Sequence, residues 1–134
     1  MYLIDTNTLS ELRRRAAGKS EPNVVAWAAQ ANPADTRISS VTVMELELGV
    51  LLMENRNPDQ GRLLQVWLEE TIYEDFADST ICYDAAETKA CARLRAERTR
   101  PERDAMIAAT ALVHDLTVVT RNVKDFGGLG RARA

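Results

Sequence analysis

The sequence predicts an α/β protein, a three-layer α/β/α sandwich around a mostly parallel central sheet. Four short apolar segments alternate with longer segments that have helical periodicity. This alternation is typical of parallel sheets, because a crossover helix joins each strand to the next and covers one face of the sheet. The 134 residues contain no repeat or long linker, so we expect one domain over residues 1–134.

Each expected element has boundaries that the sequence favours. Short apolar segments predict strands at residues 2–4, 37–41, 80–83 and 116–119. Apolar residues at helical spacing predict helices at about residues 6–16, 21–31, 42–54, 60–73, 85–97 and 102–113. A closing strand after Phe126 is in doubt, because Gly127-Gly128-Leu129-Gly130 is a poor strand sequence.

Composition narrows the function classes. Hydrophobic residues make up 46% of the chain and charged residues 28%, as in ordinary soluble globular proteins. No apolar run approaches the ~20 residues that span a bilayer, and the first residues lack the basic region of a signal peptide. We therefore expect a cytoplasmic protein without a membrane segment. The single histidine, His114, excludes a His-rich zinc site and ends a predicted helix, where it suits the helix dipole.

Arginines gather in three places, although the formal net charge is −3. These basic groups are Arg13, Arg14 and Arg15, then Arg93, Arg95, Arg98, Arg100 and Arg103, then Arg121, Lys124, Arg131 and Arg133. Charge runs of this kind are usually solvated helix faces. The alternative is a rim of phosphate contacts around an acidic centre.

Acidic and amide side chains follow the predicted strands, at the edge where parallel sheets bind ligands. Asp5 follows the first strand, and Asn122 and Asp125 follow the last. Glu45 and Asp104 lie in the first turns of predicted helices. Carboxylates that share a cleft repel each other unless a counter-charge is present. Mg²⁺ or Mn²⁺ would supply it, because both ions prefer oxygen ligands.

Each of these residues also has a purely structural interpretation. Asp5 could cap the helix that follows it. Glu45 could close a capping box with Thr42, and Asp104 could complement a helix dipole. The remaining two could be turn residues. The chemistry therefore depends on whether these positions converge in space, which sequence alone does not show.

Four segments, at residues 2–7, 40–49, 103–111 and 118–126, together resemble one family. Their order and spacing are similar to those of PIN-domain proteins of the VapC/FitB type, which act as toxins in bacterial toxin–antitoxin pairs. The resemblance covers nearly the whole chain. It implies a parallel α/β/α fold, Mg²⁺- or Mn²⁺-dependent cleavage of RNA, homodimerisation and a small antitoxin partner.

The resemblance also implies which residues form the site. Asp5, Asp104 and Glu45 are the expected metal ligands. Asp5 and Asp104 hold the ion directly, and Glu45 binds it through water or takes the proton from the attacking water. The full catalytic set is Asp5, Thr6, Glu45, Asp104, Thr120, Asn122 and Asp125. Asn122 stands where the family often has Asp, so Asp125 is an alternative for completing the site. Glu47 is an alternative to Glu45.

Two other functions compete with a nuclease. A catalytically weak or inactive PIN-fold module could bind RNA or an antitoxin without cutting, and the neutral Asn122 favours it slightly. A phosphatase with Asp5 as covalent nucleophile is disfavoured, because Asn7 stands where haloacid-dehalogenase-like enzymes carry a second Asp. Three intact acids lead us to favour the nuclease.

A possible antitoxin surface comes from leucines that could exceed what one small core buries. They are Leu9, Leu12, Leu48, Leu51 and Leu52. Leucines at helical spacing usually pack in a core. A surplus would instead form a groove for an amphipathic antitoxin helix.

Overall fold

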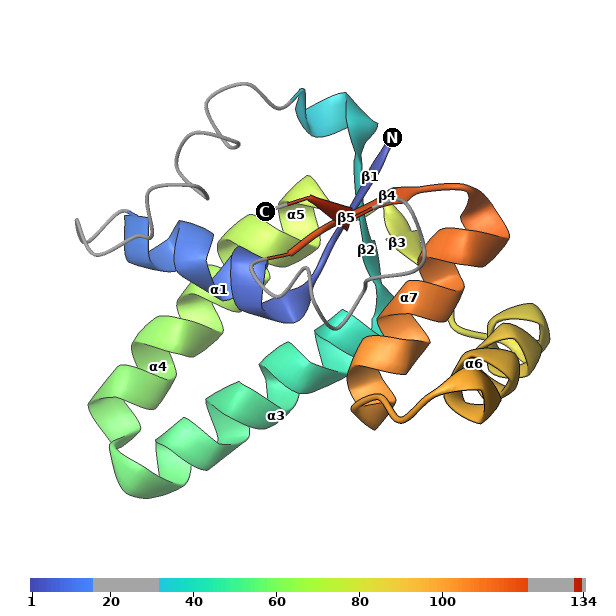
Figure 1. The fold of residues 1–134 in the computed structure, drawn as a ribbon. Helices are drawn as coiled ribbons and strands as arrows, with labels where there is room; N and C mark the ends of the chain where they lie inside the picture. The colour runs from blue at the N-terminus through green and yellow to red at the C-terminus, as the bar shows by residue number, and fades with distance from the viewer. Residues whose placement is uncertain (16–31, 121–131, 134) are drawn as a thin grey trace.

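The computed structural model describes residues 1–15, 32–120 and 132–133 (Figure 1). The helix predicted at residues 21–31, as well as Asn122 and Asp125, lies outside the described residues. The strands are β1 (Tyr2–Ile4), β2 (Thr36–Ser39), β3 (Thr80–Ile81), β4 (Thr117–Val119) and β5 (Ala132–Arg133). The helices are α1 (Thr6–Arg15), η1 (Pro33–Asp35), α3 (Ser40–Arg56), α4 (Pro58–Trp67), η2 (Leu68–Ile72), α5 (Tyr73–Asp75), α6 (Ala85–Glu97) and α7 (Glu102–His114).

The five strands form one sheet in the order β3-β2-β1-β4-β5, and every neighbouring pair is parallel. β1 is central, with Ile4 paired to Val119 on β4 and Leu3 paired to Arg37 on β2. The parallel sheet that the sequence predicts is confirmed. The doubt about a closing strand was misplaced, because Ala132 and Arg133 pair with β4 and form the sheet edge.

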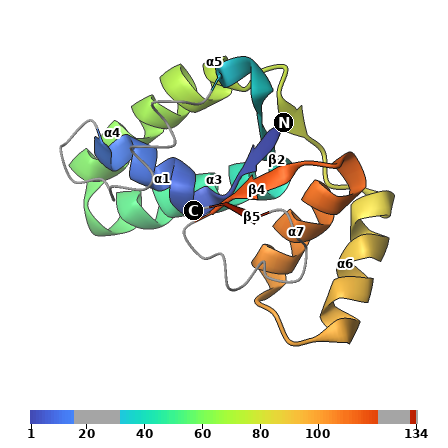
Figure 2. The same ribbon diagram turned by 45° about the horizontal axis from the view of Figure 1, so that its top comes forward.

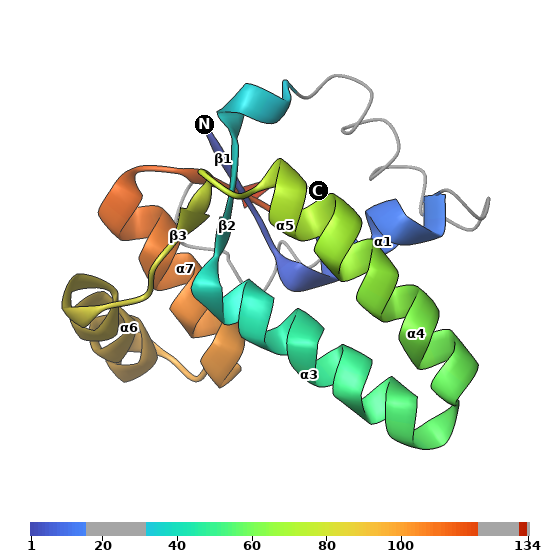
Figure 3. The ribbon, with the colours of Figure 1, turned by 180° about the vertical axis from the view of Figure 1, so that it is seen from behind.

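Helices cover both faces of the sheet (Figures 1, 2 and 3). α1, α3, α4 and α5 lie on one side, and α6 and α7 lie on the other. Figure 2 shows the sheet between these two groups from a second direction. The three-layer α/β/α arrangement is therefore confirmed. α1 and α3 begin directly after β1 and β2, and Arg103 in the first turn of α7 contacts Glu45 on α3. The starts of these three helices therefore meet the carboxyl ends of the strands at one edge, which we call the carboxyl edge.

Two hydrophobic clusters lie on opposite faces of the sheet. Leu3 and Val118 belong to the cluster beneath α6 and α7. Ile4 and Ile38 belong to the cluster beneath α3, α4 and α5. Successive strand residues point to opposite faces. Short, fully apolar strands therefore suit this sheet, because both of its faces are buried.

The strand-to-helix boundary after β2 differs from the prediction. α3 begins at Ser40 rather than at Thr42, so Val41 belongs to the helix and not to the strand. The cause is Ser39, whose hydroxyl accepts a hydrogen bond from the Val41 N–H at 3.0 Å and caps the helix. This earlier start places Thr42 inside the first turn of α3, which changes the role of Glu45.

The connection expected between the helices at residues 42–54 and 60–73 is reduced to one residue, Asn57, which joins α3 to α4. Its side chain accepts the N–H of Gln60 at 3.3 Å, and Pro58 occupies the first turn of α4. The two helices approach closely at Gly61, where an added Cβ would lie 2.5 Å from the side chain of Glu54. Among the described residues, no helix is long and apolar enough to cross a membrane.

Candidate active site

Asp5 and Thr120 lie side by side at the carboxyl edge, because they follow paired residues of β1 and β4. The Asp5 N–H donates to the Val119 carbonyl at 3.1 Å and extends the strand pairing by one step. Both side chains are buried, and that of Asp5 belongs to a residue only 6% exposed. The structure therefore brings together two of the predicted site residues from opposite ends of the chain.

Asp5 also caps α1, as its structural interpretation predicted. Its Oδ1 accepts the N–H of Thr8 at 2.8 Å. A carboxylate at a helix N-terminus satisfies a free N–H and interacts favourably with the helix dipole. These contacts hold the carboxylate in place at the edge, so capping and chemistry are compatible at this position.

Glu45 does not close a capping box, contrary to its structural interpretation. The cap of α3 is Ser39, and the Glu45 side chain crosses to α1 instead. Its Oε1 accepts a hydrogen bond from the Thr6 hydroxyl at 2.8 Å. The Thr6 oxygen also lies 3.1 Å from the hydroxyl of Thr42, which is fully buried. Because Thr6 gives its single proton to the carboxylate, Thr42 donates to Thr6 and completes a short relay.

The other oxygen of Glu45 faces an arginine. Arg103 Nη1 lies 3.5 Å from Glu45 Oε2 and joins the first turn of α7 to α3. The side chains are 48% exposed for Arg103 and 21% for Glu45. Asp5 precedes Thr6 and Asp104 follows Arg103, and both of these neighbours contact Glu45. The three acids therefore lie on or next to the connected helices α1, α3 and α7.

The donor chemistry of this edge fits a hard divalent cation, since Asp5, Glu45 and Asp104 offer only oxygen atoms. Within the described parts of the chain, no three acidic, histidine or cysteine residues lie close enough together to hold one ion. Asn122 and Asp125, the other predicted members of the site, lie outside those parts. The assignment of metal ligands therefore stays a prediction.

Glu47, the alternative acid, lies in different surroundings. Its carboxylate accepts a hydrogen bond from the Tyr73 hydroxyl of α5. Burial, together with the contact to Glu47, raises the pKa of Tyr73 well above its ordinary value. Glu47 thus ties α3 to α5, and Glu45 is the acid of this helix that reaches α1 and α7.

Sequence reasoning placed Thr6 in the site but missed two residues that hold the Thr6–Glu45 pair, Thr42 and Arg103. Thr42 was considered only as a helix cap, and Arg103 only as a member of an arginine group. The signal for Arg103 was its position beside Asp104 in a predicted first helical turn. The rest of its group differs in exposure: Arg93, Arg95 and Arg98 are exposed, and Arg100 is buried.

A second buried carboxylate lies far from this edge, between α6 and α7. Glu87 Oε1 lies 2.7 Å from His114 Nε2, so His114 has a partner that the helix-dipole prediction did not include. Burial acts to raise the pKa of Glu87, but hydrogen bonds that involve Asp84 and His114 outweigh it and lower the pKa to about 2. Glu87 also closes a capping box with Asp84 at the start of α6.

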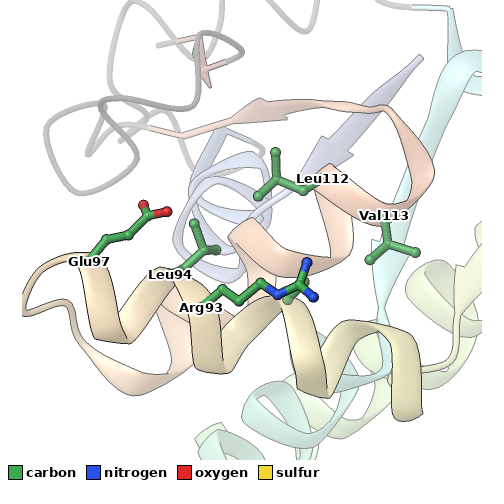
Figure 4. A pocket seen from close by; sticks show the side chains of 6 residues that line it. Arg93, Leu94, Glu97, Leu112 and Val113 are labelled. Carbon is green, nitrogen blue, oxygen red and sulfur yellow. The ribbon is translucent and has the colours of Figure 1, made fainter.

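A groove of about 330 Å³ lies between α6 and α7 (Figure 4). Its lining is Ala90, Arg93, Leu94, Glu97, Leu112 and Val113. Figure 4 shows Arg93 and Glu97 pointing away from each other, with the apolar side chains between them. Leu112 and Val113 are exposed near the C-terminal end of α7, about 12 Å along the helix from Asp104.

Comparison with known proteins identifies the family. The model of the PIN domain matches residues 2–128. The chain belongs to the PIN-domain family. This confirms the resemblance seen in the four sequence segments.

The PIN domain's relatives include proteins named as toxins and ribonucleases. Toxin FitB of Neisseria gonorrhoeae is 36% identical over 94% of this chain and 91% of its own length. The VapC ribonuclease Y4jK of Sinorhizobium fredii is 29% identical over 97% of this chain and 93% of its own.

Solved structures of similar fold include a toxin–antitoxin complex. The crystal structure of FitAcB from Neisseria gonorrhoeae matches with a TM-score of 0.88 and 32% identity, over 100% of this chain and 97% of that chain. A toxin–antitoxin complex from Klebsiella pneumoniae matches with a TM-score of 0.71 and 26% identity, again over 100% and 97%.

Proposed function

We propose that this protein is a metal-dependent endoribonuclease, the toxin of a toxin–antitoxin pair. The observation that carries the proposal is the position of the Glu45 side chain, which contacts Thr6 and Arg103. These two partners are the sequence neighbours of Asp5 and Asp104. The Glu45 carboxylate thus connects α3 to α1 and α7 at the carboxyl edge, which capping or stabilising α3 alone does not require. The names of the PIN-domain relatives, a toxin and a ribonuclease, support the same function.

In this proposal, Asp5 and Asp104 would hold Mg²⁺ or Mn²⁺ directly, Glu45 would bind it through water or act as the base, and Asn122 or Asp125 would complete the site. The ion would supply counter-charge to the acids and Lewis acidity at the phosphate. Glu45 accepts the proton of the attacking water, and the Thr6 hydroxyl keeps its carboxylate in position. Thr120, buried beside Asp5, orients the water or the acids from below. The protein would act in the cytoplasm, where its RNA substrate is found.

The decisive experiment replaces the charge of Asp5 without removing the helix cap. Asn caps helices about as well as Asp, so D5N should fold normally. We expect cleavage of an RNA substrate in Mg²⁺ or Mn²⁺ to fall at least ~100-fold, by analogy with the loss of other charge-stabilising catalytic groups. D59N is the matched control, because Asp59 is an exposed acid in the first turn of α4. Folded D5N that cuts at the wild-type rate would overturn the proposal.

The second candidate function, a binding module without catalysis, is favoured by one observation: the described acids do not form a three-acid cluster. EDTA separates the two functions. Loss of cleavage on adding EDTA and its return with Mn²⁺ support the nuclease. RNA binding that persists with no metal-dependent cleavage supports the module.

We propose that an antitoxin helix binds the exposed apolar surface of α3 and α4. The prediction from leucine surplus needs a correction, since Leu9 is buried in the core and the side chain of Leu12 lies outside the described part. The other three leucines are exposed, and α4 adds two more apolar side chains. The antitoxin surface consists of Leu48, Leu51, Leu52, Leu63 and Val66. Such a two-helix surface suits the apolar face of an amphipathic helix.

We also propose a homodimer through the groove between α6 and α7. A two-fold interface requires a surface that is complementary to itself. The groove meets this requirement, because Arg93 at one end can pair with the Glu97 of a second copy at the other, around shared apolar contacts.

A further inference from the structure

Both oxygens of the Glu45 carboxylate have partners, and the two partners differ in kind. Oε1 accepts the hydroxyl of Thr6 at 2.8 Å, an ordinary hydrogen-bond distance. Oε2 faces Arg103 Nη1 at 3.5 Å, which is long for a charge-assisted hydrogen bond, normally about 2.7–2.9 Å. Glu45 is therefore held firmly on the side of Thr6 and loosely on the side of Arg103.

The surroundings of the two partners strengthen this difference. Thr6 is backed by the fully buried Thr42 hydroxyl, 3.1 Å away, so moving Thr6 would disturb the core. Arg103 is half-exposed and belongs to the first turn of α7, where its long side chain can rotate into solvent at little cost. Exposed ion pairs contribute little to stability. Arg103 is thus the exchangeable partner of Glu45.

We propose that Arg103 alternates between Glu45 and an RNA phosphate. In the metal-free protein its guanidinium neutralises Glu45, and when a divalent cation takes that role, Arg103 turns outward and grips the substrate backbone. The inference rests on the proposed function and adds a residue to it. A guanidinium stays protonated at all relevant pH values and needs an anion in either position. Its planar fork matches the oxygens of a phosphodiester.

A thermodynamic consequence distinguishes this role from a fixed salt bridge. The cation and RNA both favour the same outward position of Arg103, so each should tighten the binding of the other. Removing Arg103 should have opposite effects on the two ligands. The cation would gain a carboxylate that no longer has a competing positive charge, whereas RNA would lose a phosphate contact. A merely structural arginine would weaken both or neither.

The test measures binding in the full-length protein rather than cleavage. Mn²⁺ binding is followed by the electron paramagnetic resonance of free Mn²⁺, with and without a single-stranded 2′-O-methyl RNA whose intactness is checked on a gel. Binding of the same RNA in saturating Mn²⁺ is followed by fluorescence anisotropy. The variants are R103A, R103K and, as the matched control, R62A. Arg62 is another exposed arginine, which lies 4.0 Å from the exposed Asp59 on α4.

We expect R103A to bind Mn²⁺ up to about fivefold more tightly without RNA, the range that exposed ion pairs support. We expect it to bind RNA more weakly in saturating Mn²⁺ and to lose most of the mutual tightening of Mn²⁺ and RNA. R103K should keep part of the coupling, because lysine retains the charge but not the fork. R62A should match the wild type in every measurement, and circular dichroism should show that all variants fold.

The outcomes that overturn the proposal are distinct. Unchanged or weaker Mn²⁺ binding in folded R103A overturns the exchange at Glu45. Unchanged RNA binding overturns the phosphate contact. Either result would leave the proposed function standing if D5N still abolished Mn²⁺ binding and cleavage. Wild-type protein that binds no Mn²⁺ would overturn both the proposed function and this inference.

Discussion

Glu45 and Glu87 are both carboxylates near the starts of helices, Glu45 in the second turn of α3 and Glu87 in the first turn of α6, yet their surroundings are opposite. Glu87 is 2% exposed and has two firm partners, the backbone of Asp84 and the ring of His114. Glu45 has one firm partner, Thr6, and one loose partner in Arg103 at the solvent boundary. A fully satisfied buried carboxylate stabilises a fold. An incompletely satisfied one at a sheet edge is available for a ligand.

The largest expected effect separates the two acids by activity. E45Q should lower RNA cleavage by about 10²–10⁴-fold, because a glutamine amide cannot accept the proton of the attacking water. E87Q, at the junction of α6 and α7, should cleave within about twofold of the wild type when folded, since general acid–base catalysis requires direct reach to the reacting groups. Initial rates on one RNA substrate at fixed Mn²⁺ give the comparison. Equal losses in the two variants would contradict it.

The free energy of unfolding should be affected in the reverse order, with E87Q more destabilised than E45Q. E87Q removes a buried charge from His114 and from the capping box, so we expect a loss of about 2 kcal/mol in the free energy of unfolding. E45Q should change that free energy by less than about 0.5 kcal/mol, because its arginine contact is exposed. Urea unfolding of both variants at neutral pH measures the difference. If E45Q proves the more destabilised variant, Glu45 is a structural residue.

The stabilising effect of Glu87 should also depend on pH in a defined window. Its pKa is lowered from 4.5 to about 2 in the folded protein, so its ionised form is favoured by folding. That contribution is complete above about pH 4.5 and is lost as the pH falls toward 2. The stability difference between wild type and E87Q should therefore shrink as the pH falls from about 4.5 toward 2. A difference that does not shrink over this range would contradict the lowered pKa of Glu87.

The groove between α6 and α7 predicts an effect on association rather than on catalysis. R93E and E97R should each weaken self-association about thirtyfold or less, since rim ion pairs contribute up to roughly 1 kcal/mol and occur twice in a two-fold dimer. The double variant R93E/E97R should restore it, because the opposite charges then meet again. Sedimentation equilibrium on the full chain measures this. Failure of the double variant to recover association would contradict the proposed face.

Two apolar-to-acidic variants serve as controls for each other. L112D, in the groove, should weaken self-association and leave antitoxin binding intact. L51D, on α3, should do the opposite when the chain is co-expressed with a short reading frame adjoining its gene. The physical reason is the same in both, since an aspartate cannot be buried unpaired in an apolar contact. If one variant abolished both interactions, the two surfaces would not be separate.

The order of strands and helices was predictable because it depends on the local spacing of apolar residues. Alternating short apolar segments and helical patterns predicted helices α1, α3, α4, α6 and α7 to within a few residues. Errors arose where local preferences compete. At Ser39 a side-chain cap started α3 early, and the glycine-rich tail concealed the strand β5, which depends on pairing with β4.

By itself, the sequence determined the α/β fold, the family and the presence of acids at the strand ends. Only the tertiary structure decided which of these acids meet which partners. Thr6 and Arg103 lie 39 and 58 residues from Glu45, and His114 lies 27 residues from Glu87. No local pattern encodes contacts over such separations. They arise when the fold brings distant segments together. Glu45 meets Thr6 and Arg103 at the carboxyl edge, where solvent leaves the arginine contact exchangeable, and burial between α6 and α7 fixes Glu87 against His114.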